Sequence, residues 1–291
     1  MFRVAILGCE NSHADSFLNY MNRSGKFSDV EIVGVYSDEP EACARMHDHF
    51  GLYVAKSYDE FVGKIDGLII TARHGDNHYK YAKPYITSGI PMFIDKPITV
   101  SEEEAVTFMK ELAANNVRVT GGSCCMHDAV IQKLKEIADT KPHGEILGGY
   151  LRAPLSAHNV YGGFFFYAQH LVQMVSEVFG YYPESVRMYQ KNTAYTAVIQ
   201  YPQYVVTAEY KDDNQVYYAA ISCEKTVVGE ACTLRGCFET EFDEFYCLLQ
   251  GGAQKQSYDE FMAPVFVMNA MQRSLESGKE ESVHHASIHR R

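Results

Sequence analysis

Residues 4–13 read VAILGCENSH, four apolar residues that run into a glycine and then a polar turn. A short apolar run that ends at a turn residue is typical of a strand buried on both faces of a parallel sheet. Four more such runs follow within the first 120 residues, at Glu31–Val35, Gly67–Thr71, Pro91–Ile94 and Val117–Thr120. Helical patterns fill the gaps between them. The sequence therefore predicts right-handed βαβ crossovers and a Rossmann-type, doubly wound parallel sheet of the α/β class.

The second half of the chain has a different pattern. Past residue 145, segments rich in Val, Thr, Tyr and Phe follow one another, at Ser185–Tyr189, Tyr195–Gln200, Tyr204–Tyr210, Tyr217–Ser222 and Phe242–Leu249. These residue types favour strands. Helical segments precede them, at about 167–179, and follow them, at about 261–275. We expect two domains, a Rossmann domain over residues 1–122 and an α+β domain over residues 123–291, built on a mostly antiparallel open sheet.

Charge and composition exclude several classes of function. Lys and Arg number 26 and Asp and Glu number 37, which gives a net charge of −11. Such an acidic chain is poorly suited to bind nucleic acid or an anionic membrane. No apolar run approaches the length of about 18 residues that a membrane span needs. Met1 leads almost directly into the first strand, which leaves no room for a signal peptide and predicts a cytoplasmic protein.

The turn after the first strand is the first candidate site. In a Rossmann domain this turn opens a helix whose backbone N–H groups face the pyrophosphate of a dinucleotide, usually with the pattern G-x-G-x-x-G. Only Gly8 of that pattern is present, since Glu10 and His13 occupy the other two glycine positions. A carboxylate at Glu10 repels phosphate unless it points away, while Asn11 or Ser12 is suited to cap the helix. Residues 1–122 are still predicted to bind a dinucleotide here, through these five residues.

The end of the second strand is the candidate site for the adenosine ribose. An acidic residue near this point accepts hydrogen bonds from the ribose hydroxyls in many dinucleotide-binding domains. Asp38 has that chemistry, and Ser37 is the alternative residue at the same place. No Arg follows to bind a 2′-phosphate, so the sequence favours NAD over NADP. The alternative interpretation is an ordinary turn at the end of a strand.

Lys96 is the first candidate catalytic residue. The stretch Ile94-Asp95-Lys96-Pro97 lies at the carboxyl end of a predicted buried strand, where ligands bind in open α/β sheets. Pro97 stops strand pairing and restricts the direction of the chain. We expect Lys96 to hold a substrate hydroxyl and the nicotinamide amide together.

His170 is the second candidate. Two glycines, Gly162 and Gly163, lead into an aromatic helix start, and His170 follows within two turns. Tyr167 and His170 are i, i+3 neighbours on that helix. Because the ordinary pKa of histidine lies near neutral pH, His170 is suited to act as a general base. The alternative interpretation is a core histidine with a hydrogen-bond partner.

A metal site is a lesser alternative. His74, Asp76 and His78 stand at alternate positions after the third predicted strand, and zinc or manganese binds such ligands. This pattern permits metal-assisted hydrolase or lyase chemistry. Residues on a loop that runs into a helix need not converge, however, and such residues often cap helices. We therefore expect no metal.

At these residues the chain resembles the Gfo/Idh/MocA family of oxidoreductases, which includes inositol dehydrogenases and glucose–fructose oxidoreductases. Asp95-Lys96-Pro97 is similar to the Glu-Lys-Pro motif of the family. The segment from Gly162 to His170 is similar to its Gly-Gly to Asp-x-x-x-His segment. The strand, loop and helix from Thr71 to His78 resemble the family's loop beside the cofactor, which implies cofactor contacts from Thr71, Ala72 and His78. The resemblance runs over nearly the whole chain.

The resemblance implies an NAD(P)-dependent oxidoreductase that acts on a secondary hydroxyl of a sugar, polyol or related small molecule. Lys96 would orient the hydroxyl and touch the cofactor, and His170 would take the proton. The second domain would bind the substrate and form a homodimer or homotetramer through its sheet. One departure is clear: Phe166 stands where the family has an Asp, and Tyr167 is the candidate substitute. The alternative is a catalytically degenerate protein that binds or senses a ligand on the same fold.

Overall fold

The computed structural model describes residues 1–286, which form two compact units. The first unit comprises Met1–Thr99, Glu103–Gly122 and Phe238–Tyr258. The second comprises Val100–Glu102, Ser123–Cys237 and the residues from Asp259 onward. A division into domains over 1–122 and 123–291 stays a prediction.

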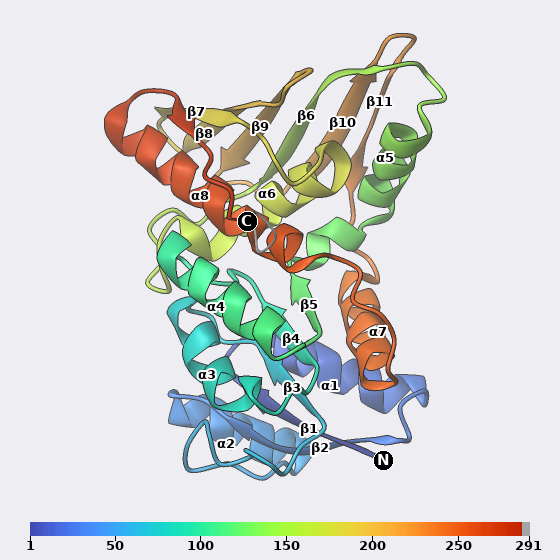
Figure 1. The fold of residues 1–291 in the computed structure, drawn as a ribbon, viewed down its shortest axis with the longest axis vertical. Helices are drawn as coiled ribbons and strands as arrows, with labels where there is room; N and C mark the ends of the chain where they lie inside the picture. Colours follow the sequence, from blue (N-terminus) through green and yellow to red (C-terminus); the bar gives the residue numbers. More distant parts are fainter. Residues whose placement is uncertain (287–291) are drawn as a thin grey trace. The chain divides into compact units, whose positions relative to one another are not determined.

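The first unit is built on a five-stranded parallel sheet, which confirms the predicted α/β fold (Figure 1). Its strands are β1 (Phe2–Leu7), β2 (Val30–Tyr36), β3 (Gly67–Ile70), β4 (Met92–Asp95) and β5 (Val119–Gly122). Their order across the sheet is β2-β1-β3-β4-β5, and every neighbouring pair is parallel. The order reverses direction at β1, so the switch point where such folds bind ligands lies at the carboxyl ends of β1 and β3.

Five helices belong to this sheet: α1 (Ser12–Ser24), α2 (Pro40–Phe50), α3 (Asp76–Ile86), α4 (Glu102–Ala114) and α7 (Cys237–Leu249). Side chains of α1, α2 and α7 share one hydrophobic cluster with those of β1, β2, β3 and β4. α7 therefore returns to the N-terminal sheet from far along the chain (Figure 1).

The prediction of a strand at Phe242–Leu249 is wrong, because this segment lies within α7. Its aromatic residues recur with helical spacing: Phe242, Phe245 and Leu249 fall at i, i+3 and i+7, and all three are buried. The Phe242 ring packs at 4.8 Å from the ring of Phe27, measured between centroids. The strand preference of aromatic residues was outweighed by this one-sided packing.

The second unit is built on a seven-stranded sheet, mostly antiparallel as predicted, with the order β11-β10-β6-β9-β8-β7-β12. The strands are β6 (Ile146–Pro154), β7 (Ser185–Lys191), β8 (Ala194–Gln200), β9 (Val205–Lys211), β10 (Tyr217–Cys223), β11 (Val227–Cys232) and β12 (Glu281–Ser282). Only the β6–β9 pair is parallel among these strands of the described chain.

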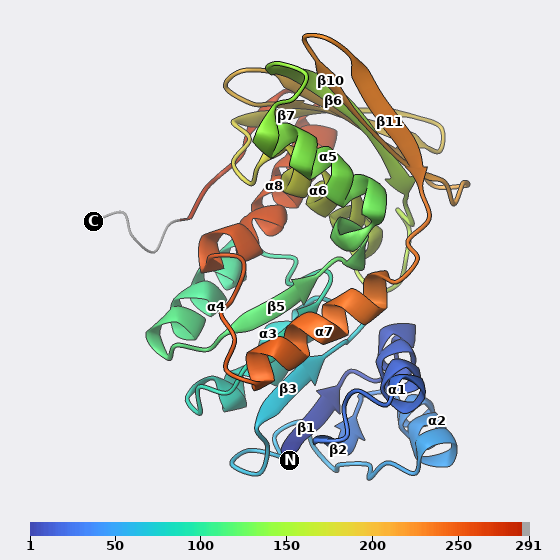
Figure 2. The same cartoon turned by 90° about the vertical axis from the view of Figure 1, so that its right-hand side faces the viewer.

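One face of this sheet carries the helices α5 (Ala129–Thr140), α6 (Phe165–Phe179) and α8 (Tyr258–Ser277) (Figure 2). A short 3₁₀ helix, η1 (Cys124–His127), follows β5 and leads into α5. Burial alternates strictly along β8, as expected for a sheet that is covered on one face only. Within residues 1–286, no helix is long and apolar enough to cross a membrane.

Candidate functional site

Gly8 fixes the turn after β1 against the loop after β3. Its φ is +82°, and a Cβ added there would lie 2.2 Å from the backbone nitrogen of Ala72. Only glycine tolerates both that conformation and that approach. Gly8 N donates to Tyr36 O (2.7 Å), and Thr71 Oγ1 donates to Gly8 O (3.0 Å). The structure thus brings Gly8, Thr71 and Ala72 together at the switch point.

The N-terminus of α1 has no side-chain cap. Asn11 occupies the N-cap position, but its side chain donates from Nδ2 to Asp95 (3.0 Å) instead of capping the helix. Asn11 therefore stands at the predicted cap position but makes no capping hydrogen bond with its side chain. The first turn of a 13-residue helix without a side-chain cap, with the positive end of its dipole, suits an anionic group such as a pyrophosphate.

Asp95 organises the end of β4. It is fully buried, and its carboxylate accepts hydrogen bonds from Asn11 and from the backbone N–H of Lys96 (2.8 Å). His13 Nδ1 lies 2.6 Å from the same carboxylate. Burial raises the pKa of Asp95, but the charge of His13 and its contact, together with Lys96, outweigh burial and lower the pKa below its ordinary value. An ionised Asp95 therefore joins the β1 turn to the β4 turn.

Lys96 follows Asp95 directly and is 3% exposed. Lysine is rarely buried to this degree unless its charge is used. The sequence placed it at the carboxyl edge of the sheet, and the structure agrees, with β4 ending at Asp95. Because Asp95 holds the turn, the Lys96 backbone is fixed at this edge.

The end of β2 carries Asp38 and Ser37, whose side chains have different partners. Asp38 accepts from Tyr36 Oη (2.6 Å), Tyr81 Oη (2.9 Å) and Lys80 Nζ (3.2 Å). Burial raises the pKa of Asp38, but these three hydrogen bonds outweigh it and lower the pKa. Ser37, by contrast, donates to Glu10, which reaches across from the turn after β1.

Glu10 is buried, at 6% exposure, and its two carboxylate oxygens accept hydrogen bonds from two different loops. Oε2 accepts from Ser37 Oγ (2.6 Å) and Oε1 accepts from the backbone N–H of Arg73 (2.9 Å). The carboxylate is thus turned toward the end of β2 and the loop after β3. Sequence reasoning named Glu10 and Ser37 separately and missed that they bond each other.

His78 is wholly buried, with Nε2 at 2.8 Å from Ala72 O. Burial lowers its pKa, so the ring is neutral near pH 7. The metal alternative had grouped His78 with His74 and Asp76, but His74 Nδ1 lies 3.6 Å from Asp76 at a partly exposed position. Within residues 1–286, no group of three or more His, Cys, Asp or Glu side chains is placed to hold a metal ion.

A second polar centre lies in the second unit, around His170 of α6. His170 is 5% exposed, and its Nδ1 lies 2.7 Å from Ser123 Oγ and 3.4 Å from Cys125 Sγ. Burial raises the pKa of Cys125, but hydrogen bonds from Cys124 and the charge and contact of His170 lower it well below its ordinary value. Sequence reasoning missed Ser123 and Cys125. Their position just after β5, at a strand's carboxyl end, is the signal that would have found them.

Aromatic rings lead up to His170. The Tyr167 ring stands edge-on to it, with centroids 5.0 Å apart, and burial raises the pKa of Tyr167. Phe166, at the position of the family's Asp, packs against Tyr167 at 5.2 Å and Tyr161 at 5.8 Å. All three rings are partly exposed. They form an apolar wall one helical turn before His170.

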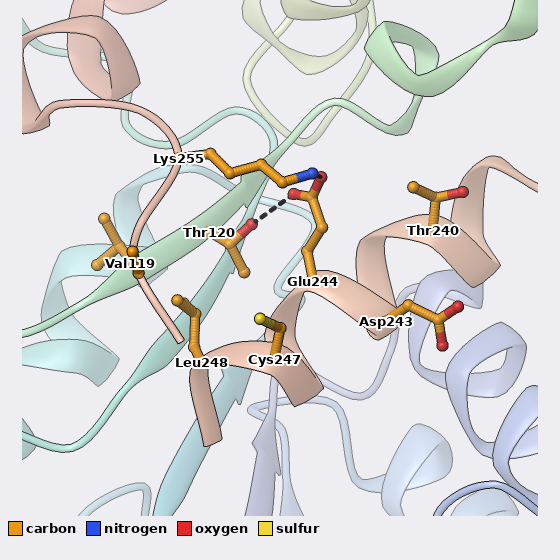
Figure 3. Close-up of a pocket in the computed structure, with 9 residues that line it drawn as sticks. Val119, Thr120, Thr240, Asp243, Glu244, Cys247, Leu248 and Lys255 are labelled. Carbon is orange, nitrogen blue, oxygen red and sulfur yellow. Dashed lines mark hydrogen bonds and ion pairs between the residues drawn. The ribbon is translucent and has the colours of Figure 1, made fainter. Parts of the chain in front are cut away.

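A hollow of about 730 Å³ opens at the end of β2 in the first unit, and Ser37 and Asp38 are among its lining residues. This hollow adjoins the candidate dinucleotide site. A further hollow of about 280 Å³ lies between β5 and α7, where Glu244 pairs with Lys255 (2.6 Å) and accepts from Thr120 (Figure 3). The residues that line this further hollow include none of the predicted site residues.

Comparison with known proteins agrees with this geometry. Residues 2–123 match the family model GFO_IDH_MocA, described as an oxidoreductase family with an NAD-binding Rossmann fold. A search of curated protein sequences finds no match.

Solved structures share the fold over the whole chain. A putative myo-inositol dehydrogenase from Sinorhizobium meliloti 1021 is 16% identical, with a TM-score of 0.82 over 98% of this chain and 100% of that chain. A scyllo-inositol dehydrogenase from Lactobacillus casei with bound NAD(H) and scyllo-inositol is 14% identical, with a TM-score of 0.84 over 97% and 99%. The WlbA dehydrogenase from Chromobacterium violaceum, in complex with NADH and UDP-GlcNAcA, is 15% identical, with a TM-score of 0.82 over 98% and 97%.

These three likenesses concern the fold, while the family model concerns the sequence of the first unit. The match over residues 2–123 includes the Gly8 turn, the Glu10–Ser37 contact and the Asp95–Lys96 corner. Residues 2–123 are thus similar to the Gfo/Idh/MocA family of oxidoreductases with its NAD-binding Rossmann fold, and the chain as a whole shares the fold of the solved dehydrogenases.

Proposed function

We propose that this protein is an NAD-dependent dehydrogenase or reductase that acts on a secondary hydroxyl of a sugar, polyol or related small molecule. The observation that carries the proposal is the buried Lys96, held at the carboxyl end of β4 by the Asp95 network. The uncapped N-terminus of α1 beside it suits a pyrophosphate. Structures with the same fold hold NAD(H) with scyllo-inositol, and NADH with a sugar nucleotide.

NAD, when bound, accepts the hydride from the carbon of the substrate hydroxyl. Its pyrophosphate and adjoining groups would be held by Gly8, by the α1 amides of Ser12 and His13, and by the loop at Thr71 and Ala72. Lys96 donates hydrogen bonds to the substrate hydroxyl, which orients it and favours loss of its proton. The Lys96 side chain is already buried, so it has little rotamer freedom left to lose when it does so.

His170 takes the hydroxyl proton in this proposal. Since Nδ1 faces Ser123 and Cys125, the other ring nitrogen, Nε2, is the one assigned to the substrate. Phe166 and Tyr161 bind the apolar face of a sugar or polyol ring, and Tyr167 is a further proton donor beside His170. The loss of the family's Asp at Phe166 makes the wall more apolar than an inositol site with a carboxylate.

Oligomerisation and location complete the proposal. The uncovered face of the seven-stranded sheet is the proposed contact of a homodimer or homotetramer. Light scattering of the purified protein tests it, and a monomer at micromolar concentration would refute it.

The eight cysteines are free thiols, which fits a reducing cytoplasm.

The proposed function is tested by Lys96→Ala. In a screen of polyols, sugars and related hydroxy compounds with NAD, the wild-type protein should turn over at least one of them. Lys96→Ala should fold normally, bind NADH and lose at least about a hundredfold in turnover, the lower scale for positioned acid–base help. Near-wild-type turnover by this variant would refute the role of Lys96.

A degenerate, ligand-binding protein is the second candidate, favoured by Phe166 in place of the family's Asp. Such a protein would bind a polyol or NADH by calorimetry and yet show no hydride transfer in either direction. Restoring the acid with Phe166→Asp separates the two candidates, because activity that appears only in this variant identifies a site that has lost its chemistry.

A further inference from the structure

The end of β2 lacks a carboxylate at the residue that follows the strand directly. Ser37 stands there, and a hydroxyl carries no charge to select between a ribose diol and a 2′-phosphate. Asp38 is next in the chain, but it already accepts hydrogen bonds from Tyr36, Tyr81 and Lys80. Lys80 Nζ lies 3.2 Å from it, in a pair whose two side chains are both about half exposed.

A carboxylate nevertheless lies at Ser37, and it comes from another loop. Glu10 Oε2 is 2.6 Å from Ser37 Oγ, which donates to it. The second oxygen, Oε1, is held at 2.9 Å by the Arg73 N–H, so the carboxylate is fixed between the ends of β2 and β3. Each oxygen of a carboxylate has room for about two hydrogen bonds, so both can accept one more.

The position of Glu10 in the chain is equally informative. It occupies the place of the second glycine of the dinucleotide pattern, where a side chain that pointed outward would repel the pyrophosphate. Here the side chain is buried and turned sideways to Ser37, so its charge acts at the ribose end of the site. The sequence departs from the usual pattern twice, because an acid is missing directly after β2 and an acid is added after β1. The structure places the added acid, Glu10, against the residue where the other is missing, Ser37.

We propose that Glu10 supplies the carboxylate that accepts the hydrogen bonds of the adenosine ribose diol and thereby selects NAD over NADP. The inference rests on the proposed function and goes further, because it assigns coenzyme selectivity to the turn after β1. A 2′-phosphate placed at this carboxylate meets a like charge and finds no donor on it. A ribose diol offers the O–H donors that the carboxylate accepts.

The experiment measures binding of NADH and NADPH to the full-length protein by calorimetry, which needs no turnover. The chain has no Trp, so quenching of intrinsic fluorescence is a poor probe. Wild-type protein should prefer NADH by roughly a hundredfold, the scale of a charged hydrogen bond and its repulsive counterpart. Glu10→Gln keeps the shape but removes the charge, and should reduce that preference by at least about tenfold.

A reciprocal exchange gives the stricter test. Glu10→Gly alone should weaken NADH binding, and adding Ser37→Asp to it returns a carboxylate to the same place from β2. The double variant should regain NADH binding and the preference over NADPH. Glu41→Gln, which removes one exposed carboxylate from the first turn of α2, is the matched charge control and should leave both affinities unchanged. Thermal unfolding confirms that each variant is folded.

The outcomes separate the inference from the proposed function. Wild-type protein that binds neither nucleotide contradicts both. Wild-type protein that binds NADH while Glu10→Gln keeps the full preference contradicts the inference alone. Tighter binding of both nucleotides by Glu10→Gln or Glu10→Gly would mean that Glu10 obstructs the site. A wild-type preference for NADPH would also overturn the inference and assign the 2′-phosphate to Lys80.

Discussion

The two units hold their buried polar residues in different ways. In the first unit, Asp95 and Glu10 each receive hydrogen bonds from more than one loop, so the carboxyl ends of β1, β2, β3 and β4 are tied together by charge. In the second unit, the His170 ring contacts one hydroxyl and one thiol, and aromatic rings pack beside it. In the proposed function, the first network keeps a coenzyme site in place, and the second positions the His170 ring to act on a substrate.

The largest expected effect is that of Asp95→Asn, which tests whether buried charge stabilises the first unit. The fully buried carboxylate has His13, Asn11 and the Lys96 N–H as partners, and removing one member of a buried charged pair costs about 3–5 kcal/mol. We expect a loss of that size in the free energy of unfolding, measured with urea at pH 7. Asp15→Asn, in a partly exposed pair with Arg45, is the control and should cost less than about 1 kcal/mol.

The loss should also depend on pH in one direction. Because the pKa of Asp95 is lowered on folding, its stabilisation is complete above the ordinary value of 3.8 and is lost as pH falls through the lower folded value. The difference between wild type and Asp95→Asn should therefore shrink as pH falls below 3.8. A difference that vanished near neutral pH would contradict an ionised Asp95.

The second prediction tests the role of Lys96, which follows Asp95 at the end of β4. Lys96→Ala should lower turnover at least about a hundredfold while NADH binding changes by less than about tenfold. Lys110→Ala, at an exposed position of α4, is the matched control and should keep wild-type turnover. Equal losses in turnover and in NADH affinity would make Lys96 a cofactor anchor without a part in proton transfer.

The third prediction concerns the second unit. Ser123→Ala removes the hydroxyl at 2.7 Å from His170 Nδ1, and should lower turnover about tenfold and move the pH–rate profile, because the ring loses the contact that orients it. Ser176→Ala, which removes a buried hydroxyl on α6, is the control. Reduced turnover with an unmoved pH profile would point to a packing role for Ser123.

The smallest expected effect is at His78. Its folded pKa lies below the ordinary value of 6.5, so the unfolded chain takes up a proton first as pH falls. Its contribution to stability is therefore complete above pH 6.5 and decreases below it, by at most about 1.4 kcal/mol per pH unit. His78→Gln should unfold with a shallower pH dependence than wild type between pH 5.5 and 6.5, and identical slopes would contradict a buried neutral ring. His49→Gln, at an exposed position of α2, is the matched control.

Much of the first unit could be predicted because its signals are local. Short apolar runs that end in turn residues mark parallel strands, and the ends of those strands mark the site, so Gly8 and Lys96 were found from sequence. The strand predicted at Phe242–Leu249 failed because a local preference of aromatic residues competes with a packing face that only the folded sheet supplies.

The contacts within the sites could not be predicted, because each depends on chain segments that are far apart. Glu10 meets Ser37 across 27 positions, and His170 meets Ser123 across 47. The sequence indicated that Glu10 repels phosphate unless it points away, but its direction depends on a hydroxyl at the end of another strand. Residue types predict the chemistry of a site, but the topology of the fold determines which residues come into contact.

Calorimetric titration of the wild-type protein with NADH tests the central claim most directly. The uncapped helix α1, the Gly8 turn and the Asp95 network predict binding of one NADH per chain with micromolar affinity, and weaker binding of NADPH. Absence of any binding up to millimolar NADH would contradict the account, and would leave the N-terminal unit with a Rossmann fold that no longer holds its cofactor.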